Sequence, residues 1–159
     1  MQNNKTGDAM TDDILKLDNQ LCHRFYTVAN AFARAYRPLL SELGITYPQY
    51  VVMMALWEKD NITIHQLLQK TRIDGGAMSL ILKKLTTKNL LNVVSDEHDK
   101  RVKRVLLTQQ GKAAKDKALA IPKQMRCNFD NINNEEALEL MRLVDKVSNG
   151  LNQALCEVK

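Results

Sequence analysis

Hydrophobic residues near the start of the chain recur at three- and four-residue steps between residues 14 and 40. The members of this series are Ile14, Leu17, Leu21, Phe25, Val28, Phe32, Ala35 and Leu39. Such spacing places them on one face of a helix. A helix of about 27 residues would be about 40 Å long, which is long for so small a domain. The pattern therefore predicts a helix that packs beyond its own subunit.

A second helix is predicted to begin at "TYPQYVVMMALWEKD". Pro48 suits the first turn of a helix, where its missing amide donor costs nothing. The centre, from Val51 to Trp57, is almost wholly apolar and is expected to be buried. The end of the preceding helix is assigned to "ELGIT", with Pro38 near that end and Gly44 closing it.

Two shorter helices are predicted next, separated by a turn at "RIDGG". The first lies within "NITIHQLLQKT", with Thr63 as its N-cap. The second covers "AMSLILKKLTTKNLL", with Asp74 as its cap. Its inner side is expected to hold Met78, Ile81, Leu82 and Leu85.

The pattern then changes to β-rich segments around a charged centre, "NVVSDEHDKRVKRVLLT". Residues 92–95 and 102–107 are predicted to be the two strands of a hairpin with a long loop. Two helical stretches follow, "TQQGKAAKDKALAIPKQMRCNF" and "NEEALELMRLVDKVSNGLNQALCEVK". Pro122 should kink or shift the first of them.

A short helix, a Gly-containing turn, a second helix and a hairpin make a winged helix-turn-helix. The predicted fold class is therefore mainly α with a small β-hairpin. The predicted regions are a disordered leader at 1–13, an N-terminal helix at 14–46, the winged helix-turn-helix at 47–111 and C-terminal helices at 112–159.

The charge is concentrated in the same part of the chain. The 159 residues carry a net charge of +5, and residues 72–104 alone hold 8 basic and 4 acidic side chains. An anionic partner that meets this segment is the sharper interpretation, and a solvated surface is the alternative. Helix-turn-helix order and basic charge together favour double-stranded DNA, with a recognition helix in the major groove and the arginine-bearing hairpin in the minor groove.

Several other classes of protein are not favoured. No apolar run approaches the ~18 residues of a membrane span, and the polar first residues are no signal peptide, so a cytoplasmic location is expected. The three cysteines and three histidines lack the spacing of metal ligands, so no metal or cofactor is expected. A thiol enzyme is disfavoured because there is no Cys-x-x-Cys and the basic hairpin would be unexplained.

The segment "DKRVKRVLLTQQGK" resembles the wing signature of the MarR family of transcriptional regulators. The matching residues are Asp99, Arg101, Leu107, Thr108 and Gly111. This resemblance extends from about residue 14 to the end and implies a winged-helix repressor that binds a pseudo-palindromic operator. It also implies that the protein is dimerised through its N- and C-terminal helices, at 14–46 and 112–159, and that 47–111 is the DNA-binding region.

The same resemblance implies roles for individual side chains. Arg101 would enter the minor groove and Asp99 would orient the wing. The helix that starts near Asp74 would read the major groove. The DNA-binding residues expected on the helix and the wing are Ser79, Lys83, Lys84, Asp99, Arg101, Lys103 and Arg104.

One cysteine, Cys22 in "DNQLCHRFY", lies inside the first predicted helix. At about 100° per residue, Cys22 lies about 100° from the centre of the apolar stripe, at its edge. A small molecule can reach such a position while water is partly excluded. A lone helical cysteine is usually a small buried hydrophobe, but the edge position suits a sensor thiol better, and reactivity requires the thiolate.

Two tyrosines of the same helix bear on this choice. Tyr26, four residues on, could touch Cys22 directly. Tyr36 is 14 residues on, about 21 Å along a straight helix, so it could reach only the Cys22 of a second chain packed antiparallel. Ordinary interface packing is the alternative explanation for both tyrosines.

The stretch "LDNQLCHRFY…AYRPLL…GITYPQYVVMMALWE" resembles the organic hydroperoxide resistance regulators within the MarR family. The resemblance implies that organic hydroperoxides oxidise Cys22, that Tyr36 and Tyr47 hydrogen-bond it from the partner subunit with Tyr26 nearby, and that oxidation lowers DNA affinity. Cys127 falls where two-cysteine members carry the resolving cysteine, which implies an intersubunit Cys22–Cys127 disulfide. A small thiol could instead cap the oxidised Cys22.

The sequence departs from this subfamily at the start of the recognition helix. Gly75 and Ala77 stand where hydroxyl residues are usual, although Ser79 keeps one hydroxyl. The balance of direct and indirect readout of the operator is therefore expected to differ.

Three other functions are less favoured by the sequence. A MarR-type repressor released by a small aromatic or lipophilic ligand would leave Cys22 structural. A peroxidase would turn over peroxide with a reductant, and an architectural protein would bind duplexes with little sequence preference. Cys156 has no assigned role.

Overall fold

The computed structural model describes the backbone of residues 13–157 and the side chains of residues 13–154. The predicted leader therefore lies, except for Asp13, outside the described residues. The chain divides after Pro122 into two compact units, Met1–Pro122 and Lys123–Lys159. Each unit is described by itself.

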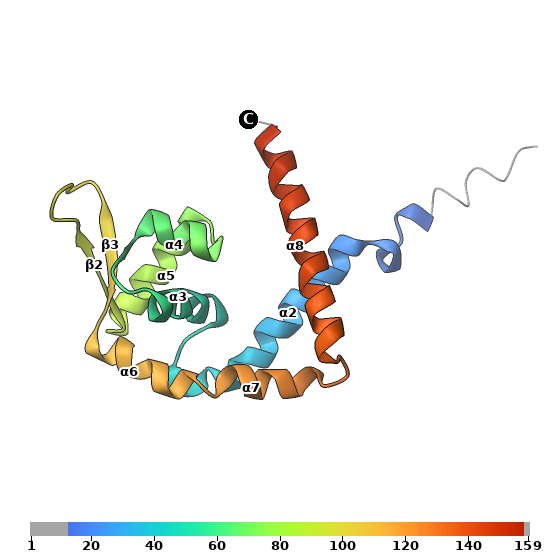
Figure 1. Ribbon diagram of the computed structural model, residues 1–159, viewed down its shortest axis with the longest axis horizontal. Coiled ribbons are helices and arrows are strands. Elements are labelled where there is room, and N and C mark those ends of the chain that lie inside the picture. The colour runs from blue at the N-terminus through green and yellow to red at the C-terminus, as the bar shows by residue number, and fades with distance from the viewer. Residues whose placement is uncertain (1–12, 158–159) are drawn as a thin grey trace, which may run out of the picture. The chain divides into compact units, whose positions relative to one another are not determined.

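The first unit is mostly helical with a small sheet (Figure 1). Its elements are η1 (Leu17–Asn19), α2 (Leu21–Leu39), η2 (Ser41–Leu43), α3 (Tyr47–Glu58), β1 (Ile62–Thr63), α4 (Ile64–Thr71), α5 (Gly75–Thr87), β2 (Leu91–Ser95), β3 (Lys103–Leu107) and α6 (Gln109–Ala118). α7 (Ile121–Arg126) crosses the division, and the second unit continues with η3 (Cys127–Phe129) and α8 (Asn134–Glu157). The break between α6 and α7 falls just before Pro122, where the sequence predicts one.

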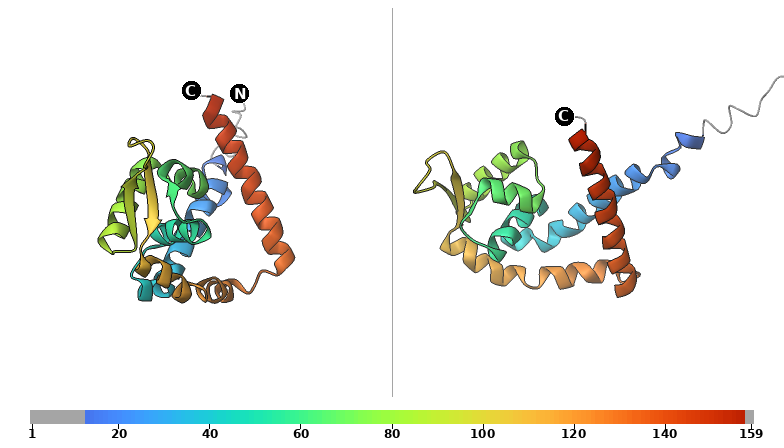
Figure 2. Two further views of the ribbon diagram at one scale, coloured as in Figure 1. Left: turned by 60° about the vertical axis from the view of Figure 1, so that its left-hand side comes forward. Right: turned by 45° about the horizontal axis from the view of Figure 1, so that its top comes forward.

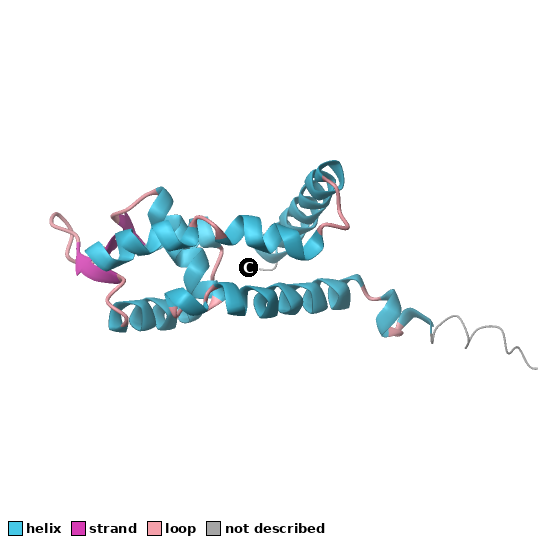
Figure 3. Ribbon diagram, turned by 90° about the horizontal axis from the view of Figure 1, so that it is seen from below, coloured by secondary structure: helices cyan, strands magenta, loops and turns pink. Residues whose placement is uncertain are grey.

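The three strands form one antiparallel sheet in the order β1-β3-β2. Val105 on the central strand faces Ile62 on one side and Val93 on the other. The hairpin of β2 and β3 was predicted to within a residue or so, but β1 was not predicted, because two residues carry no readable alternation. The strands are confined to one end of this unit, and the hairpin projects as a slender wing beside α4 and α5 (Figures 2 and 3).

The core of the first unit lies where α3, α4 and α5 meet the sheet. Leu56, Leu67, Leu85 and Val105 are each completely buried there. The predicted inner side of α5 is confirmed, since Met78, Ile81, Leu82 and Leu85 are all buried. Burial of a leucine stabilises the fold by about 1.5–3 kcal/mol relative to exposure, so these residues fix α4 and α5 against the sheet.

The prediction of one continuous helix over residues 14–40 is wrong. α2 begins only at Leu21, because Gln20 adopts an extended backbone conformation with φ −92° and ψ 108°. The side chains of Asn19 and Gln20 donate to the backbone carbonyls of Asp13 and Ile14. Amide side chains of this kind compete with helical hydrogen bonding, so the apolar periodicity continues through a stretch where the short 3₁₀-helix η1 and the extended Gln20 stand in place of a continuous α-helix.

The ends of the middle helices also differ from prediction. Gly75 and Gly76 belong to the first turn of α5 rather than to a turn before it. α5 ends at Thr87 rather than running on to residue 91, since Asn89 has a positive φ of 56° and β2 starts at Leu91. Gly44, with φ 62°, closes the segment after α2 as predicted, although η2 intervenes.

Candidate nucleic-acid interface and thiol site

Local hydrogen bonds build the helix-turn-helix formed by α4 and α5. Thr63 is the N-cap of α4, and a capping box joins it to Gln66 through bonds of 3.0 and 3.1 Å. Arg72 ends α4 in the left-handed conformation with φ 56°. Asp74 then caps α5, its Oδ1 accepting from the Ala77 amide at 2.8 Å. Both predicted caps are confirmed, and they fix where the second helix of the motif starts.

The outer surface of α5 carries the residues predicted to face DNA. Ser79, Lys83 and Lys84 are exposed, on the side of the helix away from the core. The Ser79 hydroxyl donates to the Gly75 carbonyl oxygen at 2.9 Å. The two lysines therefore present cationic side chains to solvent, while the serine hydroxyl is engaged within its own helix.

At the tip of the wing, Asp99 positions Arg101. Asp99 Oδ1 accepts from the Arg101 amide at 3.0 Å and from its Nε at 3.2 Å. The side chain of Arg101 remains 93% exposed. The loop thus presents a cationic side chain at its tip, and a carboxylate from the same loop sets its direction.

Arg104 has a different environment, although it lies only three residues further on. Its Nε and Nη2 donate to the Oδ1 and carbonyl oxygen of Asn61 at 2.7 and 2.6 Å, and its Nη1 donates to Asp96 Oδ2 at 3.0 Å. The guanidinium therefore joins the turn after α3 to the base of the wing loop. Nearby, Lys103 donates to Ser95 across the hairpin at 2.7 Å.

Asp96 accepts hydrogen bonds from several directions. The pKa of its carboxyl is lowered by the His98 amide, by the Arg104 guanidinium and by the Asp99 amide, in that order. All three donors favour the charged form of the carboxylate. Asp96 therefore stays ionised as the point where the two ends of the wing loop and Arg104 meet.

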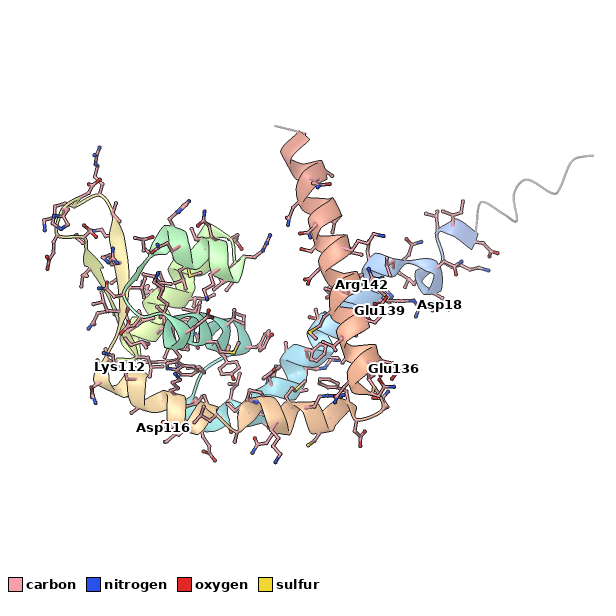
Figure 4. The ribbon with its side chains drawn as sticks, in the orientation of Figure 1. Asp18, Lys112, Asp116, Glu136, Glu139 and Arg142 are labelled. Atoms are coloured by element: carbon pink, nitrogen blue, oxygen red, sulfur yellow. The ribbon has the colours of Figure 1, made fainter. Side chains whose placement is uncertain are left out.

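Asp60, just after α3, ties this helix to the sheet and to α6. Its Oδ1 accepts from the Leu107 amide at 2.9 Å, and its Oδ2 lies 3.5 Å from the Lys112 ammonium. Figure 4 labels Lys112 on α6. Together with Asn61, Asp60 makes the turn after α3 the anchor of the wing.

The Leu-Thr-x-x-Gly part of the wing signature has a structural explanation. The Thr108 hydroxyl accepts from the Gly111 amide at 3.0 Å and donates to the Asn89 carbonyl at 2.6 Å. A Cβ added to Gly111 would lie 1.9 Å from the Leu90 carbonyl oxygen, so only glycine fits. The Gly111 carbonyl accepts from Trp57 Nε1 at 2.8 Å. These contacts hold the start of α6 against α3 and against the residues just before β2.

Three tyrosines meet where α2 and the start of α3 lie together. The ring of Tyr36 is centred 4.5 Å from that of Tyr47 and 6.0 Å from that of Tyr50. Tyr50 in turn lies 6.1 Å from Trp57. Burial, followed by the neighbouring Tyr47 and Tyr50, raises the pKa of Tyr36, and burial also raises the pKa of Tyr50. The phenols of Tyr36 and Tyr50 therefore remain protonated donors at neutral pH.

The cysteine predicted to react lies at the opposite end of α2. Cys22 is exposed, as is Cys127 in η3. Tyr26, one turn from Cys22, is 67% exposed. The partial shielding expected at Cys22 is therefore not supplied by the first unit itself. Tyr36 and Tyr47 are brought together, but 14 residues of helix separate Tyr36 from Cys22.

The second unit consists mainly of α8. Glu139 and Arg142 form an ion pair on it, with Arg142 Nη2 2.6 Å from Glu139 Oε1 (Figure 4). Asn133 and Glu136 cap its start through reciprocal bonds of 2.9 Å. Large apolar side chains such as Leu138, Met141 and Leu151 are more than half exposed.

Membrane spans and metal clusters are both absent from the part of the chain that the structure describes. No helix among the described residues is long and apolar enough to cross a membrane. Within the same residues, no three potential metal ligands lie together.

Sequence reasoning missed Asp60, Asn61 and Asp96 as supports of the wing, and Tyr50 as a member of the tyrosine cluster. The contacts of Asn61 with Arg104 span 43 positions in the chain, and no local pattern encodes them. Tyr50 could have been found, because it lies three residues after Tyr47 and such spacing places two side chains on one helix face.

Comparisons with known proteins agree with this geometry. A sequence profile of the family described as transcriptional regulator SarA/Rot matches residues 34–118. The organic hydroperoxide resistance transcriptional regulator of Bacillus subtilis is 36% identical over 110 residues, which cover 69% of this chain and 75% of that protein.

Two solved structures extend the comparison. AbfR of Staphylococcus epidermidis is 27% identical, with a TM-score of 0.70 over 91% of this chain and 99% of the other. A MarR variant from E. coli, solved with operator DNA, is 26% identical, with a TM-score of 0.72 over 80% of this chain and 92% of the other. The Bacillus subtilis relative is named as a transcriptional regulator, and the MarR variant was solved with operator DNA. From its profile match, its relatives and its winged helix, this chain belongs to the MarR and SarA/Rot family of DNA-binding transcriptional regulators.

Proposed function

We propose that this protein is a homodimeric, thiol-switched repressor that releases its operator when an organic hydroperoxide oxidises Cys22. The observation that carries the proposal is the separation of two halves of one site along α2. The donors of the tyrosine cluster lie at one end of the helix, and the exposed Cys22 lies at the other.

Helix geometry supports the dimer. Residues 22 and 36 are about 21 Å apart along α2, so Tyr36 cannot reach the Cys22 of its own helix. Two α2 helices packed antiparallel would bring each Cys22 to the tyrosines of the other subunit. The apolar face of α2 is available for such packing, because Leu21 is 59% exposed and Val28 is 51% exposed.

The tyrosines have the chemistry that this arrangement requires. A raised pKa keeps the hydroxyl of Tyr36 protonated, so it can donate to a thiolate. Donation to the charged form of a thiol favours the reactive thiolate. Tyr47 supplies a second hydroxyl within the same pair of rings, and Tyr26 lies one turn from Cys22 on α2.

The redox step is proposed in two stages. The Cys22 thiolate attacks the terminal oxygen of the hydroperoxide, the O–O bond breaks, and sulfur is oxidised to sulfenic acid. The alkoxide that leaves takes a proton from solvent, which balances the proton that the Cys22 thiol released on ionising, and becomes the alcohol. The Cys127 thiol of the other subunit then attacks the sulfenic sulfur, which forms a disulfide and releases water. Formation of this bond needs the two Cα atoms within about 7 Å. The movement that this requires would displace the winged helix-turn-helix regions of the two subunits relative to each other.

The reduced dimer is proposed to hold a pseudo-palindromic operator through both grooves. Ser79, Lys83 and Lys84 on α5 would face the major groove, and Arg101, oriented by Asp99, would enter the minor groove. Lys103 is proposed on the DNA-facing side as well, and Arg104 is proposed to support DNA binding by holding the wing through Asn61 and Asp96. The name of the Bacillus subtilis relative supports an organic hydroperoxide as the signal.

Non-reducing electrophoresis tests the proposal. The protein is treated with a stoichiometric amount of cumene hydroperoxide, and wild type is compared with Cys22→Ser and Cys127→Ser. We expect a covalent dimer in wild type that is absent from both variants. Cys156→Ser is the matched control, since it removes a thiol without an assigned role and should leave the covalent dimer intact.

DNA binding is measured on the same samples. Oxidation should weaken operator binding by wild type and not by Cys22→Ser. A modified Cys22 without a covalent dimer, detected by intact mass, would replace Cys127 with a small capping thiol. An unmodified Cys22 would overturn the redox proposal.

A second candidate function is release by a small aromatic or lipophilic ligand, with Cys22 structural. A groove of about 300 Å³ between α3 and α6 favours it, and its lining is mostly apolar. The residues that line it include Tyr50, Met54, Trp57, Ala118 and Leu119. Cys22→Ser separates the two candidates, because a ligand sensor with this substitution would still respond to its ligand.

A further inference from the structure

The outer ridge of the recognition helix α5 has an unusual composition. Residues 78, 81, 82 and 85 face the core, and at about 100° per residue the opposite ridge consists of Gly76, Leu80, Lys83 and Thr87. All four are exposed. Leu80, in the middle of the ridge, is 63% exposed, and thus presents a large apolar side chain outward at the centre of a DNA-reading helix.

Two of the three hydroxyl groups of α5, those of Ser79 and Thr87, donate within the helix. The Ser79 hydroxyl donates to the Gly75 carbonyl at 2.9 Å, and the Thr87 hydroxyl donates to the Lys83 carbonyl at 3.0 Å. The first turn of the helix contributes two glycines, Gly75 and Gly76, which have no side chains. On the outer ridge itself, the neutral hydrogen-bond donors that normally read base edges are therefore either engaged, as at Thr87, or missing.

An exposed leucine can read one feature of the major groove. Thymine carries a C5-methyl group there, and apolar side chains contact it, whereas the other base edges present hydrogen-bond donors and acceptors. We propose that Leu80 is a specificity-determining residue that recognises thymine by packing on its C5-methyl group in each half of the operator.

The surroundings of Leu80 favour DNA over a protein partner. Lys83 and Lys84 on the following turn are both exposed and cationic, which suits a phosphate backbone on either side of a groove. The lysines would hold the helix on any duplex, and Leu80 would supply discrimination. The inference rests on the DNA binding of the family and not on the thiol switch, so the two proposals fail separately.

Replacement of thymine by uracil tests the inference, because it removes only the C5-methyl group. The probe is a duplex that the reduced wild-type protein itself selects from a random-sequence pool. Each dT is replaced by dU singly and then in symmetric pairs, and affinity is measured for wild type, Leu80→Ala and Leu80→Met. Circular dichroism and thermal melting establish that the variants fold, as expected for an exposed position.

For wild type we expect one thymine per half-site whose replacement lowers affinity about fourfold, the effect of one buried methyl group. Replacement of the symmetric pair should lower it about fifteenfold. Leu80→Ala should abolish this sensitivity, and Leu80→Met should retain part of it. If no replacement weakens wild-type binding, or if Leu80→Ala keeps the full sensitivity, the assignment is overturned. Lys83→Gln is the control, since it should weaken binding to every duplex and leave the dU pattern unchanged.

Discussion

Two arginines of the wing, Arg101 and Arg104, give a sharp test of how this region works. Both are expected from sequence to bind DNA, but their surroundings differ. Arg101 is 93% exposed at its side chain, and Arg104 is 31% exposed and bonded to Asn61 and Asp96. We predict that Arg101→Gln affects DNA binding alone, and that Arg104→Gln affects the stability of the fold as well.

The magnitudes follow from the hydrogen bonds that each arginine makes. Arg104→Gln removes two bonds to Asn61 and one to Asp96, all three made by the charged guanidinium. Hydrogen bonds that involve a charged group contribute about 1.5–3 kcal/mol each, but neighbouring interactions are not additive. With partial exposure, we expect a loss of about 2 kcal/mol in the free energy of unfolding. For Arg101→Gln, the exposed pair with Asp99 contributes at most about 1 kcal/mol.

Urea unfolding at one fixed protein concentration measures the stability term. DNA binding is measured at several salt concentrations, since each phosphate that the protein no longer neutralises makes the slope of log affinity against log salt shallower by about one. Arg101→Gln, which removes a cation from the DNA, should make the slope shallower by about one per subunit. Arg104→Gln should weaken binding with the slope unchanged, because it misplaces the wing without removing a cation from a phosphate. A shallower slope with unchanged stability for Arg104→Gln would refute this reasoning.

Three further predictions concern the scaffold. Gly111→Ala should destabilise the fold by about 3 kcal/mol or more, because the added Cβ would lie 1.9 Å from the Leu90 carbonyl oxygen. Gly75→Ala, whose Cβ would meet open space, is the control in the same urea titration. Equal losses of stability in the two variants would contradict the argument. Asp74→Ala should cost about 1 kcal/mol through loss of the cap on α5, measured by thermal melting, and unchanged melting would count against the cap. The pKa of Asp96 is lowered in the fold, so the contribution of its carboxylate to stability is present above the unfolded pKa and is lost as pH falls through the folded value. The difference in unfolding free energy between wild type and Asp96→Asn should therefore shrink in acid. A difference that stays constant with pH would rule out this linkage.

The elements of the DNA-binding region could be predicted from sequence because their signals are local. Thr63 and Asp74 cap α4 and α5 through residues only three positions away. The alternation that marks β2 and β3 and the helical spacing of Met78, Leu82 and Leu85 lie within a few residues as well. Local hydrogen bonds and one-sided burial are the same wherever the chain folds, so such patterns are readable before the tertiary structure is known.

The tertiary structure alone decided which arginine of the wing is exposed to solvent and which is bonded to other parts of the fold. Arg101 and Arg104 are both arginines of the basic wing, and the sequence does not distinguish them. In the fold, Arg104 bonds to Asn61 in the turn after α3, which lies 43 positions away in the chain. It also decided that residues 14–20 do not continue α2 as one α-helix, since the side chains of Asn19 and Gln20 bond to backbone carbonyls there and Gln20 is extended. The same holds for Gly111, whose necessity arises from the approach of the Leu90 carbonyl. The periodicity of a sequence shows which face of a segment is apolar. The bonding and packing partners of a side chain depend instead on distances between segments that meet only in the folded chain.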